Sequence, residues 1–278
     1  MIEIDGLYRS YNKVEVLKNI SLTFEPGTFT AVLGRNGSGK STLARHINAI
    51  LKPQKGCVKV DGMDTRDNNM IYDIRETAGM VFQNPESQAV ASIVEDDTAF
   101  APENLGLSDS EILERVESAL HDADIKHLRY KPINTLSGGQ KQLTAIAGIL
   151  AMRPHYMIFD EGTSMLDPIS RKRVIDCVRR LKKDLNLAII WITHYMDEAA
   201  LADRVIIMDN GEIKADGTPE NIFSDIELIE RTGLELPQSA KLCVRLRNAG
   251  FNIPIVLNAE DCAREIFRLA SNYTEASQ

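Results

Sequence analysis

A glycine-rich run at residues 34–41 matches the pattern of a phosphate-binding loop, G-x-x-x-x-G-K-[ST]. Glycines allow backbone N–H groups to converge on phosphate oxygens, and a helix expected directly after the run adds a partial positive charge. We expect the Lys40 ammonium to reach the β- and γ-phosphates and the Ser41 hydroxyl to ligate Mg²⁺. The residues expected to bind nucleotide here are Gly34, Arg35, Asn36, Gly37, Ser38, Gly39, Lys40, Ser41 and Thr42.

Two adjacent acids, Asp160 and Glu161, follow an apolar run at residues 156–159. Open α/β sheets bind ligands at the carboxyl ends of their strands, where these acids would lie. We expect Asp160 to hold Mg²⁺ through water and Glu161 to orient or deprotonate an attacking water. Taken separately, the pattern fits a strand that runs into a solvated turn equally well. The phosphate loop in the same chain favours the catalytic interpretation.

A third motif, LSGGQ at residues 136–140, opens a helical segment. Small residues at a helix N-terminus form a second anion site, which one nucleotide does not require. The order and spacing of the phosphate loop, Gln83, LSGGQ, the acid pair and His194 resemble the ATP-binding cassette (ABC) ATPases over about residues 2–217. The resemblance implies ATP and Mg²⁺ as ligands. It also implies a head-to-tail dimer in which each LSGGQ serves the ATP of the other chain.

The resemblance assigns further roles to single residues. Tyr11 matches the aromatic residue that stacks on adenine, with Tyr8 as the competing candidate. Gln83 matches a ligand of Mg²⁺ or water, and His194 matches the switch histidine that bonds the γ-phosphate. It therefore implies Glu161 and His194 as catalytic residues, Ser41, Gln83 and Asp160 as Mg²⁺ ligands, and Ser137, Gly138, Gly139 and Gln140 as contacts of the partner's nucleotide.

Two positions depart from the family pattern. Gly162 stands where proline usually follows the catalytic glutamate, which widens the backbone options of the adjoining D-loop, residues 164–167. Leu143 stands where arginine is common, so we expect a surface or inter-lobe charge to be lost there.

Short apolar runs typical of buried strands flank these motifs. From about residue 85 to 152 the spacing of apolar residues predicts helices instead. Ser108 and Glu111 form a capping-box pattern, and a helix is expected over about residues 169–185. The resemblance implies an α/β P-loop NTPase fold with a mixed-sheet core, an antiparallel β subdomain and a helical subdomain over residues 1–225. A small α/β extension is expected over residues 226–278.

Composition excludes several classes of protein. The 278 residues carry a formal charge of −8, which argues against a nucleic-acid partner. No apolar run is long enough to span a membrane, and the acidic N-terminus does not resemble a signal peptide. The four cysteines form no CxxC pair, so a reducing cytoplasm is expected.

Four segments resemble the ATPases of energy-coupling factor (ECF) transporters, a group that includes cobalt-type importers. They are residues 84–88, 94–106, 165–168 and 234–237. This implies a peripheral subunit at the cytoplasmic face of the membrane. Its partners would be a second ATPase chain, a transmembrane coupling protein and a substrate-capture membrane protein. The cargo, a vitamin or a transition-metal ion, and the choice between homodimer and paralogue pair stay open. The alternatives are another ABC importer ATPase, a soluble ABC ATPase, or a regulator without turnover, which the presence of Glu161 argues against.

The segment after about residue 225 contains a helix pattern at residues 239–249, a turn at Gly250 and a second helix pattern behind Asn258. So short a segment is too small to bury a secure core of its own. Its apolar side chains therefore need the cassette or a partner's extension as a second surface. They are Leu242, Val244, Leu246, Ile266, Phe267 and Leu269.

Overall fold

The computed structural model describes residues 1–276, with side chains described to residue 271. The strands are β1 (Ile2–Tyr11), β2 (Val14–Phe24), β3 (Phe29–Leu33), β4 (Lys55–Val60), β5 (Met63–Asp64), β6 (Ala78–Val81), β7 (Tyr156–Asp160), β8 (Ala188–Ile192), β9 (Arg204–Asp209) and β10 (Glu212–Gly217). The helices are α1 (Lys40–Ile47), α2 (Ile71–Thr77), α3 (Val94–Asn104), α4 (Asp109–Asp122), α5 (Gly138–Leu150), α6 (Pro168–Leu185), α7 (Met196–Ala199), α8 (Pro219–Ser224), α9 (Ile226–Arg231), α10 (Gln238–Asn248) and α11 (Ala259–Ala276).

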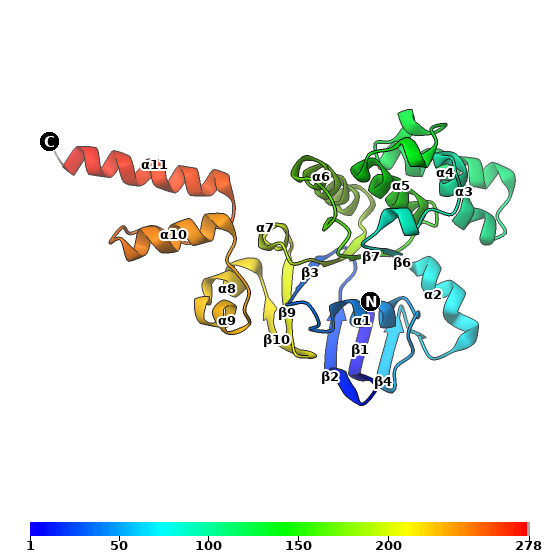
Figure 1. The fold of residues 1–278 in the computed structure, drawn as a ribbon, viewed down its shortest axis with the longest axis horizontal. Helices are drawn as coiled ribbons and strands as arrows, with labels where there is room; N and C mark the ends of the chain where they lie inside the picture. The colour runs from blue at the N-terminus through cyan, green and yellow to red at the C-terminus, as the bar shows by residue number, and fades with distance from the viewer. Residues whose placement is uncertain (277–278) are drawn as a thin grey trace.

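A six-stranded sheet in the order β10-β9-β3-β8-β7-β6 forms the centre of the chain (Figure 1). Its strands are parallel except β10, which pairs antiparallel with β9. Every residue of β3, β7 and β8 is buried, as expected for parallel strands covered on both faces. The carboxyl ends of β3, β8, β7 and β6 therefore lie next to one another along one edge.

A second sheet, in the order β2-β1-β4-β5, is antiparallel and packs its apolar face toward α1 and the main sheet. Ile2 and Ile4 of β1 are buried, while Glu3 and Asp5, which alternate with them, are exposed. This alternation is the pattern that the sequence shows at its N-terminus. The expected mixed-sheet core with an antiparallel β subdomain is confirmed.

Helices α3, α4 and α5 pack together on the far side of the main sheet from β10 (Figure 1). Ser108 caps α4 as expected, because its hydroxyl accepts from the Glu111 N–H while the Glu111 carboxylate accepts from the Ser108 N–H. Ser137 and Gln140 form the same reciprocal box at the start of α5. The helical subdomain is therefore confirmed.

The first helix after the boundary expected at residue 225, α9, packs against the core of the cassette. Leu228 and Ile229 of α9 are 7% and 1% exposed and belong to the main hydrophobic core, and Leu234 and Leu236 pack against it. Their burial makes α9 part of the cassette. The segment that leaves the cassette begins at α10, directly after Pro237.

The extension is helical, which corrects the expected α/β character. Within the described part of the chain, residues 251–256 form no strand. Helices α10 and α11 contact each other and lie side by side, away from the sheets (Figure 1). A small cluster of Cys243, Ile253 and Cys262 joins them, whereas Phe267 is 78% exposed. Among the described residues, none of the helices is long and apolar enough to cross a membrane.

Candidate functional site

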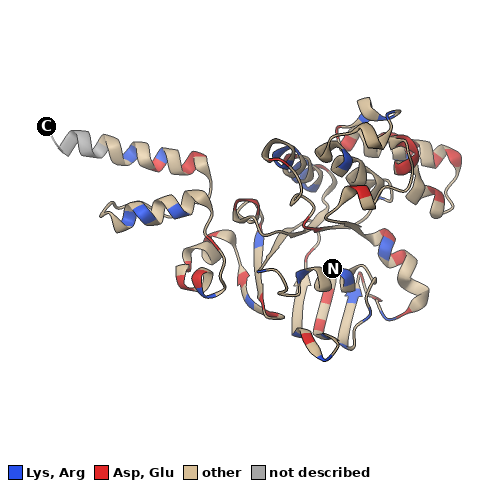
Figure 2. Cartoon of the chain, in the orientation of Figure 1, with Lys and Arg blue, Asp and Glu red and all other residues tan. Residues whose placement is uncertain are grey.

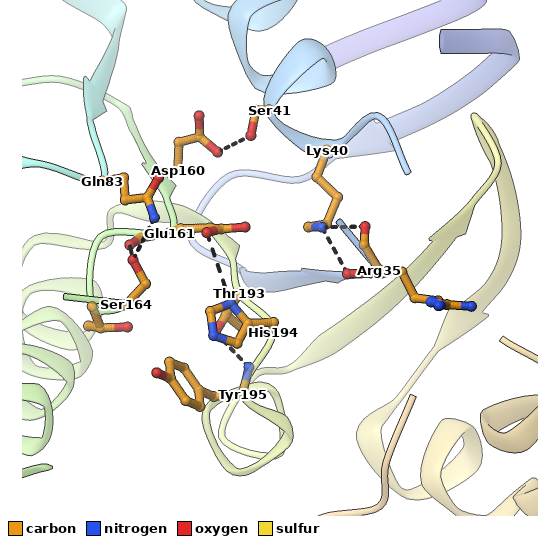
Figure 3. Close-up of polar contacts among 12 residues, drawn as sticks. Arg35, Lys40, Ser41, Gln83, Asp160, Glu161, Ser164, Thr193, His194 and Tyr195 are labelled. Carbon is orange, nitrogen blue, oxygen red and sulfur yellow. Dashed lines mark hydrogen bonds and ion pairs between the residues drawn. The ribbon is translucent and has the colours of Figure 1, made fainter. Parts of the chain in front are cut away.

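The phosphate loop connects β3 to α1 and is shaped by close backbone approaches. A Cβ at position 34 would lie 2.2 Å from the Met208 carbonyl oxygen, and Gly39 has a φ of 104°. Lys40 is 4% exposed, and its ammonium donates to the carbonyl oxygens of Gly34 at 2.8 Å and Arg35 at 3.0 Å (Figure 3). Burial lowers the pKa of Lys40, although nearby Glu161 and Asp160 oppose that shift.

Ser41 and Asp160 come from the first turn of α1 and the end of β7, and their side chains meet. The Ser41 hydroxyl donates to Asp160 Oδ1 at 2.6 Å (Figure 3). Asp160 is 6% exposed, and burial raises its pKa more than this hydrogen bond lowers it. The pair places a hydroxyl and a carboxylate oxygen together at the floor of the site.

Glu161 adopts an unusual backbone conformation, with a φ of 56° in the left-handed region. Its N–H donates to the Ile192 carbonyl at 3.1 Å, and its own carbonyl accepts from the Ser164 N–H at 3.0 Å and the Ser164 hydroxyl at 2.9 Å. Because Gly162 is absent from the positive-φ positions of the described chain, the special backbone belongs to the glutamate and not to the glycine after it. These bonds hold the loop after β7 in place.

His194 follows β8, the strand next to β7, and its Nδ1 lies 4.0 Å from Glu161 Oε2 (Figure 3). Gln83 follows β6, on the other side of β7, and its amide donates to the Ser164 hydroxyl at 3.1 Å. Four neighbouring strands thus deliver the phosphate loop, His194, the acid pair and Gln83 to one edge. Adjacent strand ends account for this meeting of residues that are far apart in sequence.

A hollow of about 370 Å³ lies over this edge. Its lining is Val16, Asn36, Gly37, Gly39, Lys40, Ser41, Thr42, Gln83 and Glu161. Val16, a half-buried residue of β2, was not expected from the sequence, which offers no signal that this strand reaches the loop. Gly34 and Arg35 instead line a neighbouring hollow of about 550 Å³, together with His194 and residues 233–236. Ser38 is buried beneath the loop.

The aromatic candidates lie outside the lining of the phosphate hollow. Tyr11 ends β1, is 40% exposed and lies under the Arg9 guanidinium at 4.8 Å. Tyr8 is half-buried on the same strand, with the Lys55 ammonium 5.7 Å from its ring centroid. Tyr11 is the more accessible of the two for stacking.

The LSGGQ residues also lie outside that lining. Ser137 and Gln140 are held by their mutual cap at the start of α5, and a Cβ at Gly139 would lie 2.7 Å from the Ser170 side chain. Leu143, on the same helix, is 2% exposed in the main core. The chain therefore has an apolar side chain packed in its interior at the position where the family pattern has a charge, and the expected loss of an ion pair there stays a prediction.

Comparisons with known proteins agree with this arrangement. The profile of the family described as ABC transporter matches residues 17–164. The chain is 50% identical to the energy-coupling factor transporter ATP-binding protein EcfA1 of Caldanaerobacter subterraneus over 91% of this chain and 92% of that protein. It is 44% identical to the cobalt import ATP-binding protein CbiO of Syntrophus aciditrophicus over 99% of both.

Solved structures agree as well. The structure of cbiO1 from Clostridium perfringens, part of the cbiONQ transporter complex, matches with a TM-score of 0.77 and 35% identity over 90% of this chain and 96% of that one. The ATP-binding cassette MJ0796, captured after hydrolysis with ADP and Pi, matches with a TM-score of 0.71 and 26% identity over 79% of this chain and 99% of that one. The profile, the relatives and the fold agree: this chain belongs to the ABC transporter family of ATP-hydrolysing subunits.

Proposed function

We propose that this chain is the ATPase subunit of an energy-coupling factor type importer, peripheral to the cytoplasmic face of the membrane. The observation that carries the ATPase part is the hollow at the ends of β3, β8, β7 and β6, where Lys40, Ser41, Gln83 and Glu161 converge. The importer part is supported by the relatives, named as ECF and cobalt import ATPases. The cargo would be a vitamin or a transition-metal ion.

The residues present fit Mg²⁺ bound together with ATP. Magnesium prefers oxygen ligands and usually takes only one or two from the protein, with the rest from phosphates and water. Ser41 and Asp160 supply adjoining oxygens, and Gln83 adds an amide oxygen at the rim. When bound, the metal neutralises charge on the phosphates. Lys40 would bind the β- and γ-phosphates, and the loop N–H groups would surround them.

Glu161 is the proposed general base. Its carboxylate lines the hollow opposite the phosphate loop, in position to accept a proton from a water that attacks the γ-phosphate. His194 lies beside it and would hydrogen-bond the γ-phosphate, so that both groups respond to the same phosphate. Positioning and electrostatic stabilisation supply most of the catalysis in such transfers.

Glu161→Gln should retain ATP binding and lose most of the turnover, because the amide fills the same space but cannot accept the proton. We expect kcat to fall at least 10-fold at saturating Mg-ATP, with the dissociation constant for ATP within about threefold of the wild type. Steady-state hydrolysis and equilibrium nucleotide binding measure the two effects. Near-normal turnover of the purified variant would refute the assignment.

The N-terminus of α5 is the proposed contact for the nucleotide of a second chain. Ser137, Gly138, Gly139 and Gln140 do not line this chain's own phosphate hollow among the described residues, yet they form a small-residue helix start that suits an anion. A head-to-tail dimer would bring each α5 to the partner's hollow. The partner is a second copy or a related ATPase.

Mixed dimers distinguish sites shared between two chains from sites built within single chains. A dimer with Lys40→Ala in one chain and Ser137→Arg in the other keeps one complete composite site, so about half the turnover should remain. The matched control carries both substitutions in one chain beside a wild-type chain, which damages both composite sites and should be inactive. Differently tagged chains allow each dimer to be purified and assayed. Sites built within single chains would give the reverse result.

The extension is proposed to hold two ATPase chains together. Leu242 and Phe267 are 42% and 78% exposed, although the small cluster beneath them buries Cys243 and Cys262. Basic residues also line α10, as Figure 2 shows in blue. A surface of this kind suits helix-on-helix contact with a second extension, which would keep the chains paired while the nucleotide faces separate.

Truncation after Pro237 should lower the dimer fraction without ATP and leave ATP binding to a single chain within about twofold. A chain that ends at Pro237 keeps α9 packed in the main hydrophobic core. A chain that ends at Asp225 would lack Leu228 and Ile229, which belong to that core. Phe267→Ser, which changes one exposed side chain, should lower the dimer fraction in the same direction. Sedimentation without ATP measures both variants, and dimer fractions equal to the full chain would contradict the proposal.

The proposed contact with the membrane subunit lies at residues 84–105. A hollow of about 390 Å³ there is lined by Glu86, Ala89, Ala91, Ser92, Pro132, Ile133, Asn134 and Lys141. Ser92 in this lining lies two residues before α3, whose first turn contains Glu95, Asp96 and Asp97. Gln83, which lines the phosphate hollow, directly precedes this segment, so a change at the phosphate site would be transmitted to this surface through the chain.

Cysteines introduced at Ser87 or Ala91 should crosslink to the membrane subunit in the assembled transporter. The background variant carries Cys57→Ser, because Cys57 is half-exposed while the other three cysteines are buried. Lys183→Cys, at an exposed position near the end of α6, is the matched control and should give no crosslink. Crosslinks only from the extension would contradict this placement.

A further inference from the structure

Glu198 is an acid in the interior of the chain that none of the roles above uses. It lies in α7 and is 3% exposed. Its Oε1 accepts from the Thr163 hydroxyl at 2.8 Å, and its Oε2 accepts from Trp191 Nε1 at 2.9 Å and from the Thr193 hydroxyl at 2.5 Å. A buried carboxylate is stable only when donors surround it, and here three meet it.

Two of these donors come from the loops that carry the proposed catalytic groups. Thr163 is two residues after Glu161, and Thr193 directly precedes His194. The Thr193 hydroxyl also accepts from the Tyr195 N–H at 3.0 Å, so the backbone on both sides of His194 is fixed (Figure 3). One carboxylate therefore holds the loop after β7 and the loop after β8.

Arg171 of α6 joins the same two loops from the other side. Its guanidinium lies 3.6 Å from the centroid of the Tyr195 ring and donates to the Leu166 carbonyl at 3.3 Å. Its Nε lies 3.8 Å from Glu198 Oε1 and has no hydrogen-bond partner of its own among the described residues. The charge of Glu198 thus faces a positive group that contacts both loops.

We propose that Glu198 is a positioning residue for ATP hydrolysis, which joins the Thr163 and Thr193 loops so that Glu161 and His194 keep a fixed separation. It touches no reacting atom. The inference rests on the roles proposed for Glu161 and His194 above. Its physical basis is that hydrogen bonds to a charged acceptor in a low-dielectric interior are strong, so the two loops move as one unit.

Replacement of either hydroxyl isolates one side of this link. Thr163→Val and Thr193→Val keep the side-chain shape and remove the donor. Each should lower kcat at least fivefold in the full-length chain in its purified assembly, with the ATP dissociation constant within about threefold. Thr163→Ser and Thr193→Ser keep the hydroxyl and should restore turnover to within about twofold. Glu198→Gln removes the charge at equal size and should lower kcat at least as far.

The double variant Thr163→Val/Thr193→Val tests the link itself. If both hydroxyls act through one carboxylate, the double variant should turn over within about twofold of the weaker single variant, because the second loss removes a bond that no longer joins anything. Tyr156→Phe is the matched control. It also removes a buried hydroxyl that donates to a carboxylate, Asp61 at 2.7 Å, but at the opposite end of β7, and it should keep turnover.

Thermal unfolding of every variant separates loss of positioning from loss of fold. A purely structural Glu198 predicts lower unfolding temperatures with unchanged kcat per folded chain, and that result would overturn the proposal. Valine variants that turn over within twofold of the wild type, or losses that multiply in the double variant, would overturn it too. Normal turnover of Glu161→Gln would instead refute the proposed function, so the two failures can be told apart.

Discussion

The arrangement of four parallel strands, β3, β8, β7 and β6, constrains every polar group of the site. These strands are apolar on both faces and pair in fixed register, for example Asp160 with Ile192 and Val81 with Phe159. Their carboxyl ends cannot shift relative to one another without unpairing buried backbone groups, which is costly. Loops of few residues therefore suffice to place a lysine, a histidine, two carboxylates and an amide along one edge of the sheet. The peripheral sheet and the helices cover this arrangement and seal its faces.

Burial gives the site its electrostatic character. Lys40 and Asp160 are almost fully buried. Burial lowers the pKa of Lys40 and raises the pKa of Asp160, and both shifts favour the neutral form. Both are nevertheless hydrogen-bonded, the ammonium to loop carbonyls and the carboxylate to Ser41. The groups expected to meet phosphate and metal are thus already oriented by their own neighbours. Such preorganisation limits the rearrangement that binding requires.

The sequence predicted the motifs and the strands that carry them, because a phosphate loop, an acid pair and buried strands each leave a local pattern. It could not predict contacts that depend on where separate elements meet. The burial of Leu143, the packing of Leu228 and Ile229 into the cassette, and Val16 beside the phosphate loop all arise from tertiary packing. Glu198 belongs to the same group, since an acid in a short helix resembles a solvated residue until Thr163, Trp191 and Thr193 are brought around it.

The left-handed backbone of Glu161 lowers the stability of the fold at the residue proposed above as the general base. A residue with a side chain costs on the order of 1–2 kcal/mol in this region, whereas glycine adopts it freely. Glycine at position 161 would relieve that cost while removing the carboxylate. A lineage freed from the need to hydrolyse ATP would therefore drift toward glycine or asparagine at this position and gain stability. Glutamate at this position is therefore favoured by the catalytic role proposed for its carboxylate and opposed by the conformational preference of its backbone.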